Sequence, residues 1–278
     1  MDAPSGDDVQ QQIIRELKVR AAIDPDQEIE RRVAFLREHM AASGQHSLVL
    51  GISGGVDSTV AGRLAQLAVE SARAQGMDAA RFVAMRLPYG VQHDEEDART
   101  ALRFIDPDEL LEVDIKPASD AILESLDQGG LQFRDAGHRD FVMGNIKARQ
   151  RMIAQYAVAG ARSGLVVGTD QAAEAMMGFF TKYGDGACDL VPLTGLNKRQ
   201  VRQLGQALGV PARLVDKVPA ADLESLDPGK TDEEALGVSY DEIDDFLEGR
   251  PVTDRGRAII LETWRATAHK RRLPIEPD

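Results

Sequence analysis

The sequence predicts an α/β fold built on a doubly wound parallel sheet with helices on both faces. From Ser47 to Gly168, short apolar segments alternate with longer helix-forming segments. The apolar segments are almost continuously hydrophobic, as expected for parallel strands that are buried on both faces. The first of them, Leu48-Val49-Leu50, leads directly into a glycine-rich turn and then a helix. Sheets of this kind bind ligands beyond the carboxyl ends of their strands.

Two helices are expected before the first strand. Ile13, Ile14 and Leu17 lie at helical spacing in a short amphipathic segment. A second helix should begin after Asp24-Pro25, because apolar residues recur at helical spacing from there on. We expect both helices to pack on the sheet or on a partner subunit.

The strands themselves are expected over residues 47–52, 82–87, 110–115 and 165–168. The helices that connect them should run to about residue 75, then over 93–104, 118–127 and 138–162. Since the carboxyl ends of parallel strands meet at one edge of the sheet, Ser53, Arg86 and Thr169 should lie near one another.

The chain changes character after the last of these strands. Residues 179–186 are aromatic and glycine-rich, too broken for a core helix, and a helix is expected over 197–208. Residues 218–231 offer little that could pack and predict a mobile loop. Short helices around 232–248 and 253–269 should close the chain, and neither an internal repeat nor a clean linker is evident.

Composition excludes several classes of protein. The 278 residues carry a formal net charge of −13, which disfavours nucleic acid as a partner because phosphate backbones attract basic surfaces. The single cysteine, Cys188, cannot support a disulfide framework or a cysteine metal site, and we interpret it as a packing residue. No signal peptide is visible, and no apolar run approaches the ~20 residues that span a bilayer. These features predict a soluble, cytoplasmic protein.

The turn after the first strand is the strongest chemical signal. Its sequence is Gly51-Ile52-Ser53-Gly54-Gly55-Val56-Asp57-Ser58. Glycines let the backbone approach a ligand closely, and the following helix N-terminus offers N–H donors to an anion. Asp57 adds a carboxylate of the kind that binds a divalent cation beside phosphates. The lysine of an ordinary P-loop is missing. The alternative is a glycine turn capped by Asp57 and Ser58, although a cap needs only one such residue.

A second strand end repeats this arrangement at Gly168-Thr169-Asp170-Gln171-Ala172-Ala173-Glu174. The hydroxyl of Thr169 can reach a nucleotide. Glu174 falls in a first helical turn, where a carboxylate also stabilises the helix dipole. Paired with Asp57, however, it supplies a second oxygen ligand for Mg²⁺. We therefore predict a metal site made by Asp57 and Glu174.

The basic residues remain ambiguous at this point. Lys147, Arg149 and Arg151 share one helix, where each could face water, a site or an interface. Lys198 follows a plausible cap, Asn197, and its spacing alone favours solvent. The cluster His269-Lys270-Arg271-Arg272 could simply complement a helix C-terminus. No arrangement of residues indicates covalent catalysis by a side chain.

Several of these blocks together resemble one family, the ammonia-dependent NAD synthetases. The loop from Gly51 to Ser58 is similar to the S-G-G-x-D-S pyrophosphate loop of the ATP pyrophosphatase superfamily, whose core is Rossmann-like and similar to the adenine nucleotide alpha hydrolases. The block Gly168–Gly186, with Gly-Phe-Phe-Thr-Lys-Tyr-Gly-Asp-Gly, is far more specific to NAD synthetases. The resemblance implies one domain over 1–278, with N-terminal helices (1–46), an ATP-binding core (47–196) and a helical C-terminal part (197–278).

The resemblance also implies the reaction. ATP adenylates the carboxylate of deamido-NAD with release of pyrophosphate, and ammonia then displaces AMP to give NAD. The resemblance further implies Mg²⁺ as the cofactor and a homodimer with the substrate at its interface. Carried over by position, the implied metal ligands are Asp57 and Glu174. The implied deamido-NAD contacts are Arg149, Lys182, Asp189, His269 and Lys270. The implied ATP contacts are Gly51, Ile52, Ser53, Gly54, Gly55, Val56, Asp57, Ser58, Thr169, Lys198 and the position of Ala220.

Two departures from the family pattern stand out. Where relatives have Lys-x-Pro-Thr-Ala-Asp-Leu, this chain has Ala220 in place of the threonine whose hydroxyl would touch ATP. The chain also ends without the aromatic tail of some relatives. A glutamine-hydrolysing domain would need a catalytic cysteine and a couple of hundred further residues, so free ammonia is the expected nitrogen source.

Other functions share parts of this pattern. A GMP synthetase-like amidoligase core or a tRNA-modifying enzyme would carry the same loop, although a tRNA enzyme would need a basic face. A module that binds ATP without turnover is the alternative from a different class. Glu174 and the basic substrate residues argue against such a sensor, because it needs neither.

Overall fold

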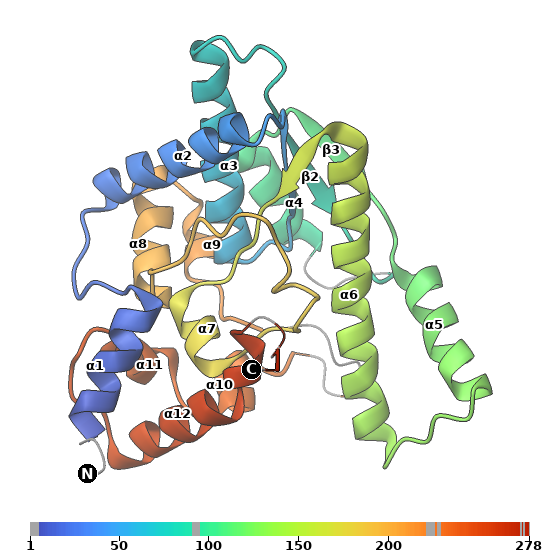
Figure 1. The fold of residues 1–278 in the computed structure, drawn as a ribbon, viewed down its shortest axis with the longest axis vertical. Coiled ribbons are helices and arrows are strands. Elements are labelled where there is room, and N and C mark those ends of the chain that lie inside the picture. Colours follow the sequence, from blue (N-terminus) through green and yellow to red (C-terminus); the bar gives the residue numbers. More distant parts are fainter. Residues whose placement is uncertain are drawn as a thin grey trace.

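The structure, a computed structural model, describes residues 6–90, 95–220, 226, 229–272, 274, 276 and 277. Its elements, drawn in Figure 1, are α1 (Gly6–Leu17), α2 (Pro25–Ala42), β1 (Ser47–Gly51), α3 (Val56–Ala74), β2 (Arg81–Arg86), α4 (Glu95–Ile105), β3 (Glu109–Glu112), α5 (Lys116–Gln128), α6 (Ala136–Arg162), β4 (Gly164–Val166), α7 (Ala172–Met177), α8 (Lys198–Leu208), α9 (Ala212–Val215), α10 (Asp232–Leu236), α11 (Tyr240–Leu247) and α12 (Asp254–Ala266).

The four strands form one parallel sheet in the order β3-β2-β1-β4. Val49 of β1 lies opposite Val83 of β2 on one side and Val166 of β4 on the other. Strands β2 and β3 therefore follow β1 toward one edge of the sheet, and the chain then returns so that β4 pairs with the other side of β1. The predicted fold class is confirmed.

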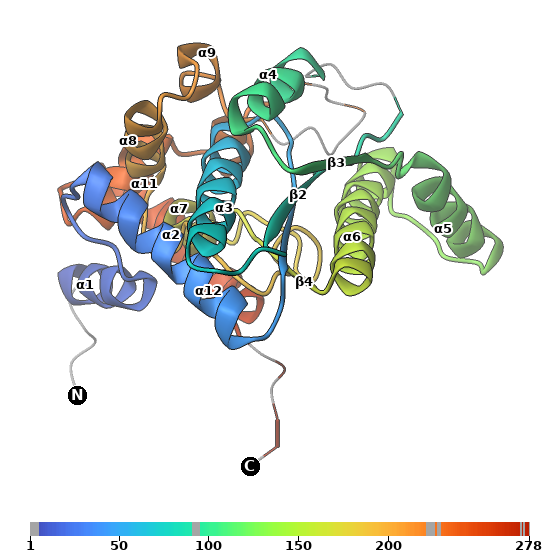
Figure 2. The same cartoon turned by 90° about the horizontal axis from the view of Figure 1, so that it is seen from above.

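Helices cover both faces of the sheet, as Figure 2 shows. Alternate strand residues explain this arrangement, since neighbouring side chains point to opposite faces. Leu48, Leu50 and Phe82 belong to a core shared with residues of α2, α3, α4 and α8. Val49 and Val83 belong to a separate core that includes Ala159 of α6. Burial on both faces accounts for the continuously apolar strands.

A second group of helices forms its own apolar cluster. Residues of α1, α7, α11 and α12 meet around the fully buried Phe246, Ile13 and Met176. Helix α1 thus packs against other helices of the same chain, whereas we expected it on the sheet or on a partner. Helix α2 packs mainly on α3 and α8. The amphipathic pattern of α1 identified a buried face but could not identify its partner.

Helix α9 and the bounds of β3 differ from the sequence-based expectations, since β3 covers Glu109–Glu112 and not 110–115. The short helix α9 was not predicted, since Pro211 and only four helical residues leave no periodic pattern. The expected loop over 218–231 falls partly on residues 221–225, 227 and 228, which lie outside the described residues. Within the described part of the chain, no helix combines the length and the apolar character needed to cross a membrane.

The sheet order places a topological switch point between β1 and β4. Strand β2 lies on one side of β1 and β4 on the other, so the strand order reverses there and a crevice is expected beyond the carboxyl ends of β1 and β4. The glycine-rich turn follows β1, and Thr169 follows β4. The fold therefore brings the two strongest chemical signals of the sequence to one place.

Candidate active site

The loop between β1 and α3 is shaped by Gly54. This residue has a φ of +87°, and a Cβ added there would lie 2.6 Å from the backbone nitrogen of Ala98. Only glycine meets both conditions without strain. Helix α3 then begins at Val56 after Gly55, which provides no side-chain cap. The first N–H groups of α3 are consequently available to an anionic ligand.

The hydroxyl groups of the loop hold the loop together. Ser53 and Ser58 contact each other through their Oγ atoms at 3.0 Å, and Ser53 Oγ also accepts a hydrogen bond from the Gly55 backbone N–H at 3.3 Å. Thr59 Oγ1 donates to the Gly55 carbonyl oxygen at 2.7 Å. These bonds fix the loop in a shape that leaves Gly51 and Gly55 facing the crevice.

Two residues from other elements fasten this loop to the sheet. Gln155 of α6 accepts a hydrogen bond from the Gly51 backbone N–H at 2.8 Å. The buried guanidinium of Arg86, at the end of β2, donates to the Ile52 carbonyl oxygen at 2.9 Å. Arg86 was placed at this edge by the strand pattern. Gln155 gave no signal, because 104 positions separate it from its partner.

A buried ion pair lies directly beside the loop. Lys198, at the start of α8, is only 2% exposed. Its Nζ lies 2.5 Å from Oδ2 of Asp57 and 4.0 Å from Oε1 of Glu174. The fold therefore brings the two predicted metal ligands and one predicted ATP contact together. The expectation that Lys198 faces solvent, drawn from spacing alone, is wrong, since α8 packs its first turn into the molecule.

The charges in this cluster are not balanced. Burial raises the pKa of the Glu174 carboxyl well above its usual range, and the charge of Asp57 adds to this effect while Lys198 opposes it. Burial alone would lower the pKa of Lys198, but the two carboxylates outweigh it and the pKa is raised. Asp170 lies nearby, and its burial, with the charges of Asp185 and Asp57, raises its pKa to about 7. The site can therefore accommodate additional positive charge.

Glu174 also caps its own helix. Its Oε2 accepts a hydrogen bond from the Gln171 backbone N–H at 3.3 Å, and Gln171 Oε1 accepts one from Ala173 N–H, which completes a capping box at α7. The helix-stabilising interpretation of Glu174 is thus correct as far as it goes. It leaves Oε1 directed toward Lys198, so the side chain can serve both roles.

These groups line a cavity of about 320 Å³. Of the predicted ATP contacts, Gly54 alone is absent from its lining, because its backbone turns against α4 instead. Ala220 lines the cavity beside Pro219, whose carbonyl oxygen accepts a hydrogen bond from the Asp232 backbone N–H at 3.0 Å. The methyl group of Ala220 offers no hydrogen bond there, as expected from the sequence.

A second cavity of about 210 Å³ adjoins the first. Both are lined by Phe179, Asp185 and Asp232, so the two spaces meet at these residues. Lys270 lines the second cavity, where its Nζ donates to the carbonyl oxygens of Gly178 at 2.9 Å and Phe180 at 2.7 Å. The interpretation of Lys270 as a mere helix-end cation is therefore incomplete, since it holds the wall of this cavity.

Three further basic residues form a chain outside the two cavity linings. Arg149 Nη2 donates to the Lys182 carbonyl oxygen at 3.2 Å, and Lys182 Nζ donates to the His269 carbonyl oxygen at 2.8 Å. Arg149 and His269 are exposed. The structure therefore gathers these three predicted substrate contacts on one surface next to Lys270.

The remaining predicted substrate residue, Asp189, lies apart from them at the edge of the sheet. Its Oδ2 accepts a hydrogen bond from the Val166 backbone N–H at 2.7 Å, and its Oδ1 accepts one from Tyr156 OH at 3.3 Å. It thereby anchors the end of β4. Its neighbour Cys188 is partly buried, and burial together with the charges of Asp170 and Asp189 raises the pKa of the thiol to about 12. Cys188 is therefore unsuited to act as a nucleophile.

The family model for NAD synthase matches residues 28–274. The chain belongs to the NAD synthase family. Over 277 residues it is 66% identical to the NH(3)-dependent NAD(+) synthetase of Streptomyces coelicolor, with all of both chains covered. The crystal structure of an NAD+ synthetase from Burkholderia pseudomallei superposes with a TM-score of 0.85 and 54% identity, covering 99% of this chain and 100% of that one.

A second similar structure is that of a protein named for a different product. The structure of an NMN synthetase from Francisella tularensis has a TM-score of 0.80 and 35% identity, and it covers 92% of this chain and 100% of that one. The NAD synthase family fold is therefore shared by proteins whose names differ in their product. A shared fold alone therefore does not assign the product, which depends on the residues of the site.

Proposed function

We propose that this chain is an ammonia-dependent NAD synthetase, a ligase that converts deamido-NAD, ATP and ammonia to NAD, AMP and pyrophosphate. The observation that carries the proposal is the joined pair of cavities. One contains the glycine loop with Lys198 and two carboxylates, and the other adjoins it through Phe179, Asp185 and Asp232. Full-length identity of 66% to the Streptomyces coelicolor relative supports the choice of nitrogen source.

The chemistry needs positioning more than it needs a reactive side chain. In the first step an oxygen of the nicotinate carboxylate bonds to the α-phosphorus of ATP, and the bond to the β,γ-pyrophosphate breaks. Backbone N–H groups at the start of α3 and the ammonium of Lys198 would bind that leaving group and offset its charge. In the second step ammonia adds to the acyl carbon, AMP leaves and one proton is released.

We further propose that the carboxylates of Asp57 and Glu174 hold Mg²⁺. Oδ1 of Asp57 is buried and accepts no hydrogen bond, and Glu174 carries a raised pKa beside it. Among the described residues, no three His, Cys, Asp or Glu side chains are grouped so that they could hold a metal unaided. Mg²⁺ commonly takes only one or two carboxylates and completes its coordination with phosphate oxygens and water. When bound, it would offset negative charge on the phosphates.

The second substrate would lie against Lys270 and the surface formed by Arg149, Lys182 and His269. The exposed position of Arg149 on α6 suits a substrate shared between two copies of the chain, so we propose a homodimer. Asp189 fits this group less well, because its carboxylate is already engaged at β4. We place the reaction in the cytoplasm and assign all of residues 1–278 to one synthetase domain.

The decisive experiment is a substrate-resolved assay on the purified chain. With ATP, Mg²⁺, deamido-NAD and ammonium chloride, we expect NAD, AMP and pyrophosphate to form in equal amounts. Omitting ammonium should stop NAD formation. ATP binding without AMP formation would contradict the proposal and favour a sensor.

Competing substrates in the same assay separate the alternatives. Nicotinate mononucleotide tests the product named for the Francisella tularensis structure, and xanthylate tests a GMP synthetase-like activity. We expect deamido-NAD to give the highest kcat/KM of the three. A higher value for either competitor would overturn the assignment of the substrate.

A further inference from the structure

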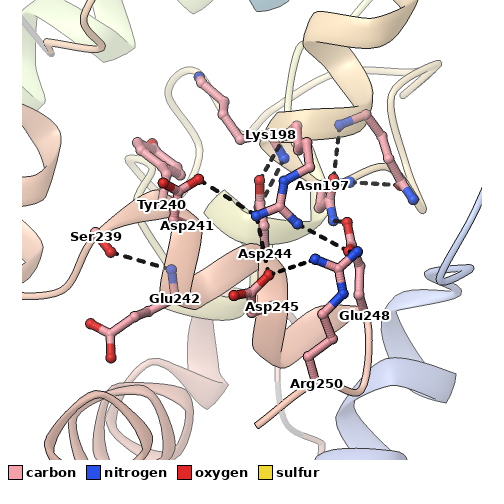
Figure 3. Close-up of polar contacts among 12 residues, drawn as sticks. Asn197, Lys198, Ser239, Tyr240, Asp241, Glu242, Asp244, Asp245, Glu248 and Arg250 are labelled. Atoms are coloured by element: carbon pink, nitrogen blue, oxygen red, sulfur yellow. Dashed lines mark hydrogen bonds and ion pairs between the residues drawn. The ribbon is translucent and has the colours of Figure 1, made fainter. Parts of the chain in front are cut away.

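The N-terminus of α8 is bound by a carboxylate from a different helix (Figure 3). Asp244 of α11 accepts one hydrogen bond from the Lys198 backbone N–H at 3.1 Å and a second from the Arg199 backbone N–H at 2.7 Å. Its two oxygens each take one of these bonds, and the residue is only 2% exposed. A buried carboxylate with two charge-assisted bonds to backbone N–H groups is a strong local restraint.

This restraint is additional to the ordinary cap of the helix. Asn197 already caps α8, since its Oδ1 accepts from the Gln200 backbone N–H at 2.8 Å within a capping box. One such cap is enough to start a helix. The bonds to Asp244 therefore do something else: they fix where the first turn of α8 lies relative to α11.

Helix α11 contacts both the backbone and the side-chain ammonium of Lys198. Tyr240, Asp244 and Glu248 follow one another at intervals of four, so they share one face of the helix. Asp244 binds the Lys198 backbone, and the ring centroid of Tyr240 lies 5.1 Å from Nζ. Glu248 accepts from Asn197 Nδ2 at 2.7 Å, just before α8 begins. Figure 3 shows these side chains converging on the start of α8.

We propose that Asp244 is a positioning residue for ATP binding, which holds the first turn of α8 so that the ammonium of Lys198 stays beside Asp57 at the pyrophosphate loop. Asp244 itself lines neither cavity and acts only through Lys198, which lines the first. The geometry it maintains is narrow, because Nζ lies 2.5 Å from Asp57 but 4.0 Å from Glu174. The inference rests on the ATP-binding half of the proposed function.

The test measures ATP affinity by calorimetry on the full chain. Asp244→Asn keeps the size of the side chain but leaves one oxygen for two N–H donors, so α8 should shift and ATP should bind roughly tenfold more weakly. Deamido-NAD affinity should change less than about twofold. Asp245→Asn is the matched control, because it removes the same charge from the adjacent residue, whose side chain binds those of Arg199 and Arg250. It should leave ATP affinity within about twofold.

A double-mutant cycle separates positioning from general stability. If Asp244 acts through Lys198, Asp244→Asn should weaken ATP binding no further in a Lys198→Ala chain. Additive losses, unchanged ATP affinity in Asp244→Asn, or an equal loss in Asp245→Asn would each overturn the inference. If Asp244→Asn does not fold, Asp244→Glu takes its place in the cycle, and failure of both to fold would assign Asp244 to stability alone. An unmodified chain that binds no ATP would remove the proposed function as well.

Discussion

Gly54 is the residue whose backbone conformation sets the shape of the pyrophosphate loop. Its φ of +87° and the 2.6 Å approach of a would-be Cβ to Ala98 nitrogen leave room for no side chain. Gly54→Ala should therefore lower the free energy of unfolding by roughly 1–3 kcal/mol or more, since both strain and a backbone clash are introduced. Thermal or urea unfolding measures the change.

Gly55 provides the control for that prediction. Its φ is −80°, and a Cβ there would meet only Ser53 Oγ at 3.5 Å. Gly55→Ala should change the free energy of unfolding by less than about 1 kcal/mol. Equal losses in the two variants would show that the loop conformation is not the cause.

The reactivity of the Cys188 thiol should depend on pH in a way that reports its burial. A thiol pKa of about 12 leaves on the order of a thousandfold less thiolate at pH 8 than an ordinary cysteine has. Iodoacetamide should therefore modify the folded chain about a thousandfold more slowly than the chain in denaturant. Because the pKa is raised, the folded-state rate should rise about tenfold per pH unit from 7.5 to 9.5. Mass spectrometry measures both rates, and a plateau near pH 9 in the folded chain would contradict the burial.

Site residues were predicted from the sequence only where a local sequence pattern indicated them. Asp57 and Glu174 each follow a strand end, so the rule for parallel sheets predicted that they would meet. Gln155 and Asp244 bind backbone groups of residues 104 and 46 positions away, respectively. Nothing in the local sequence of either residue indicates its partner.

At the scale of elements, α7 shows one side chain serving both a helix and a site. Glu174→Gln keeps the oxygen that can accept from Gln171 N–H, so the capping box should survive. The pKa of Glu174 is raised, which means that the folded chain disfavours the charged form and that ionisation near pH 7 costs stability. The variant should therefore unfold at the same or a higher temperature while NAD formation falls at least a hundredfold.

The control for this variant separates the cap from the charge. Glu174→Ala removes both, so it should lose the stability of the cap, about 1 kcal/mol, as well as activity. Turnover that persists in Glu174→Gln would reduce Glu174 to a capping residue. A drop in melting temperature with unchanged activity would lead to the same conclusion.

Predictability also varied among whole elements. The strands and the long helices α3 and α6 were predicted because apolar periodicity and glycine turns mark them. Helix α9 has only four residues, and its buried Leu214 and Val215 are held by tertiary contacts rather than by a helical pattern. The bounds of β3 were predicted less well, as residues 110–115 and not Glu109–Glu112. This strand lies at the edge of the sheet and is paired on one side only.

For the whole molecule, strand alternation predicted the parallel sheet, and the sheet order then explains where the site must lie. The cluster of α1, α7, α11 and α12 was not predicted as a unit. An amphipathic pattern shows that a helix has a buried face. Which other helix covers that face depends on shape complementarity between segments that are distant in the sequence. That cluster nonetheless carries α7 and α11, and hence Glu174 and Asp244.

The proposed homodimer is the prediction that concerns the molecule as a whole. Phe141 and Ile153 on α6 are 55% and 52% exposed, and Ile122 on the neighbouring α5 is 44% exposed. Large exposed apolar side chains on adjacent elements are typical of an interface. Arg149, which we assign to the shared substrate, lies one turn of α6 before Ile153. Ile153→Glu should therefore convert the dimer to a monomer and sharply weaken deamido-NAD binding, because a charge would be buried at the contact.

Light scattering coupled to gel filtration measures this change directly. Ala42→Glu is a suitable control, because it adds the same charge at an exposed position on α2, which packs on the opposite face of the sheet from α6. That variant should stay dimeric and active. A monomeric unmodified chain would refute the dimer, whereas a dimeric Ile153→Glu chain would move the interface away from this face of α6. In the second case Arg149 would bind substrate within its own subunit, and its exposure would need no partner to explain it.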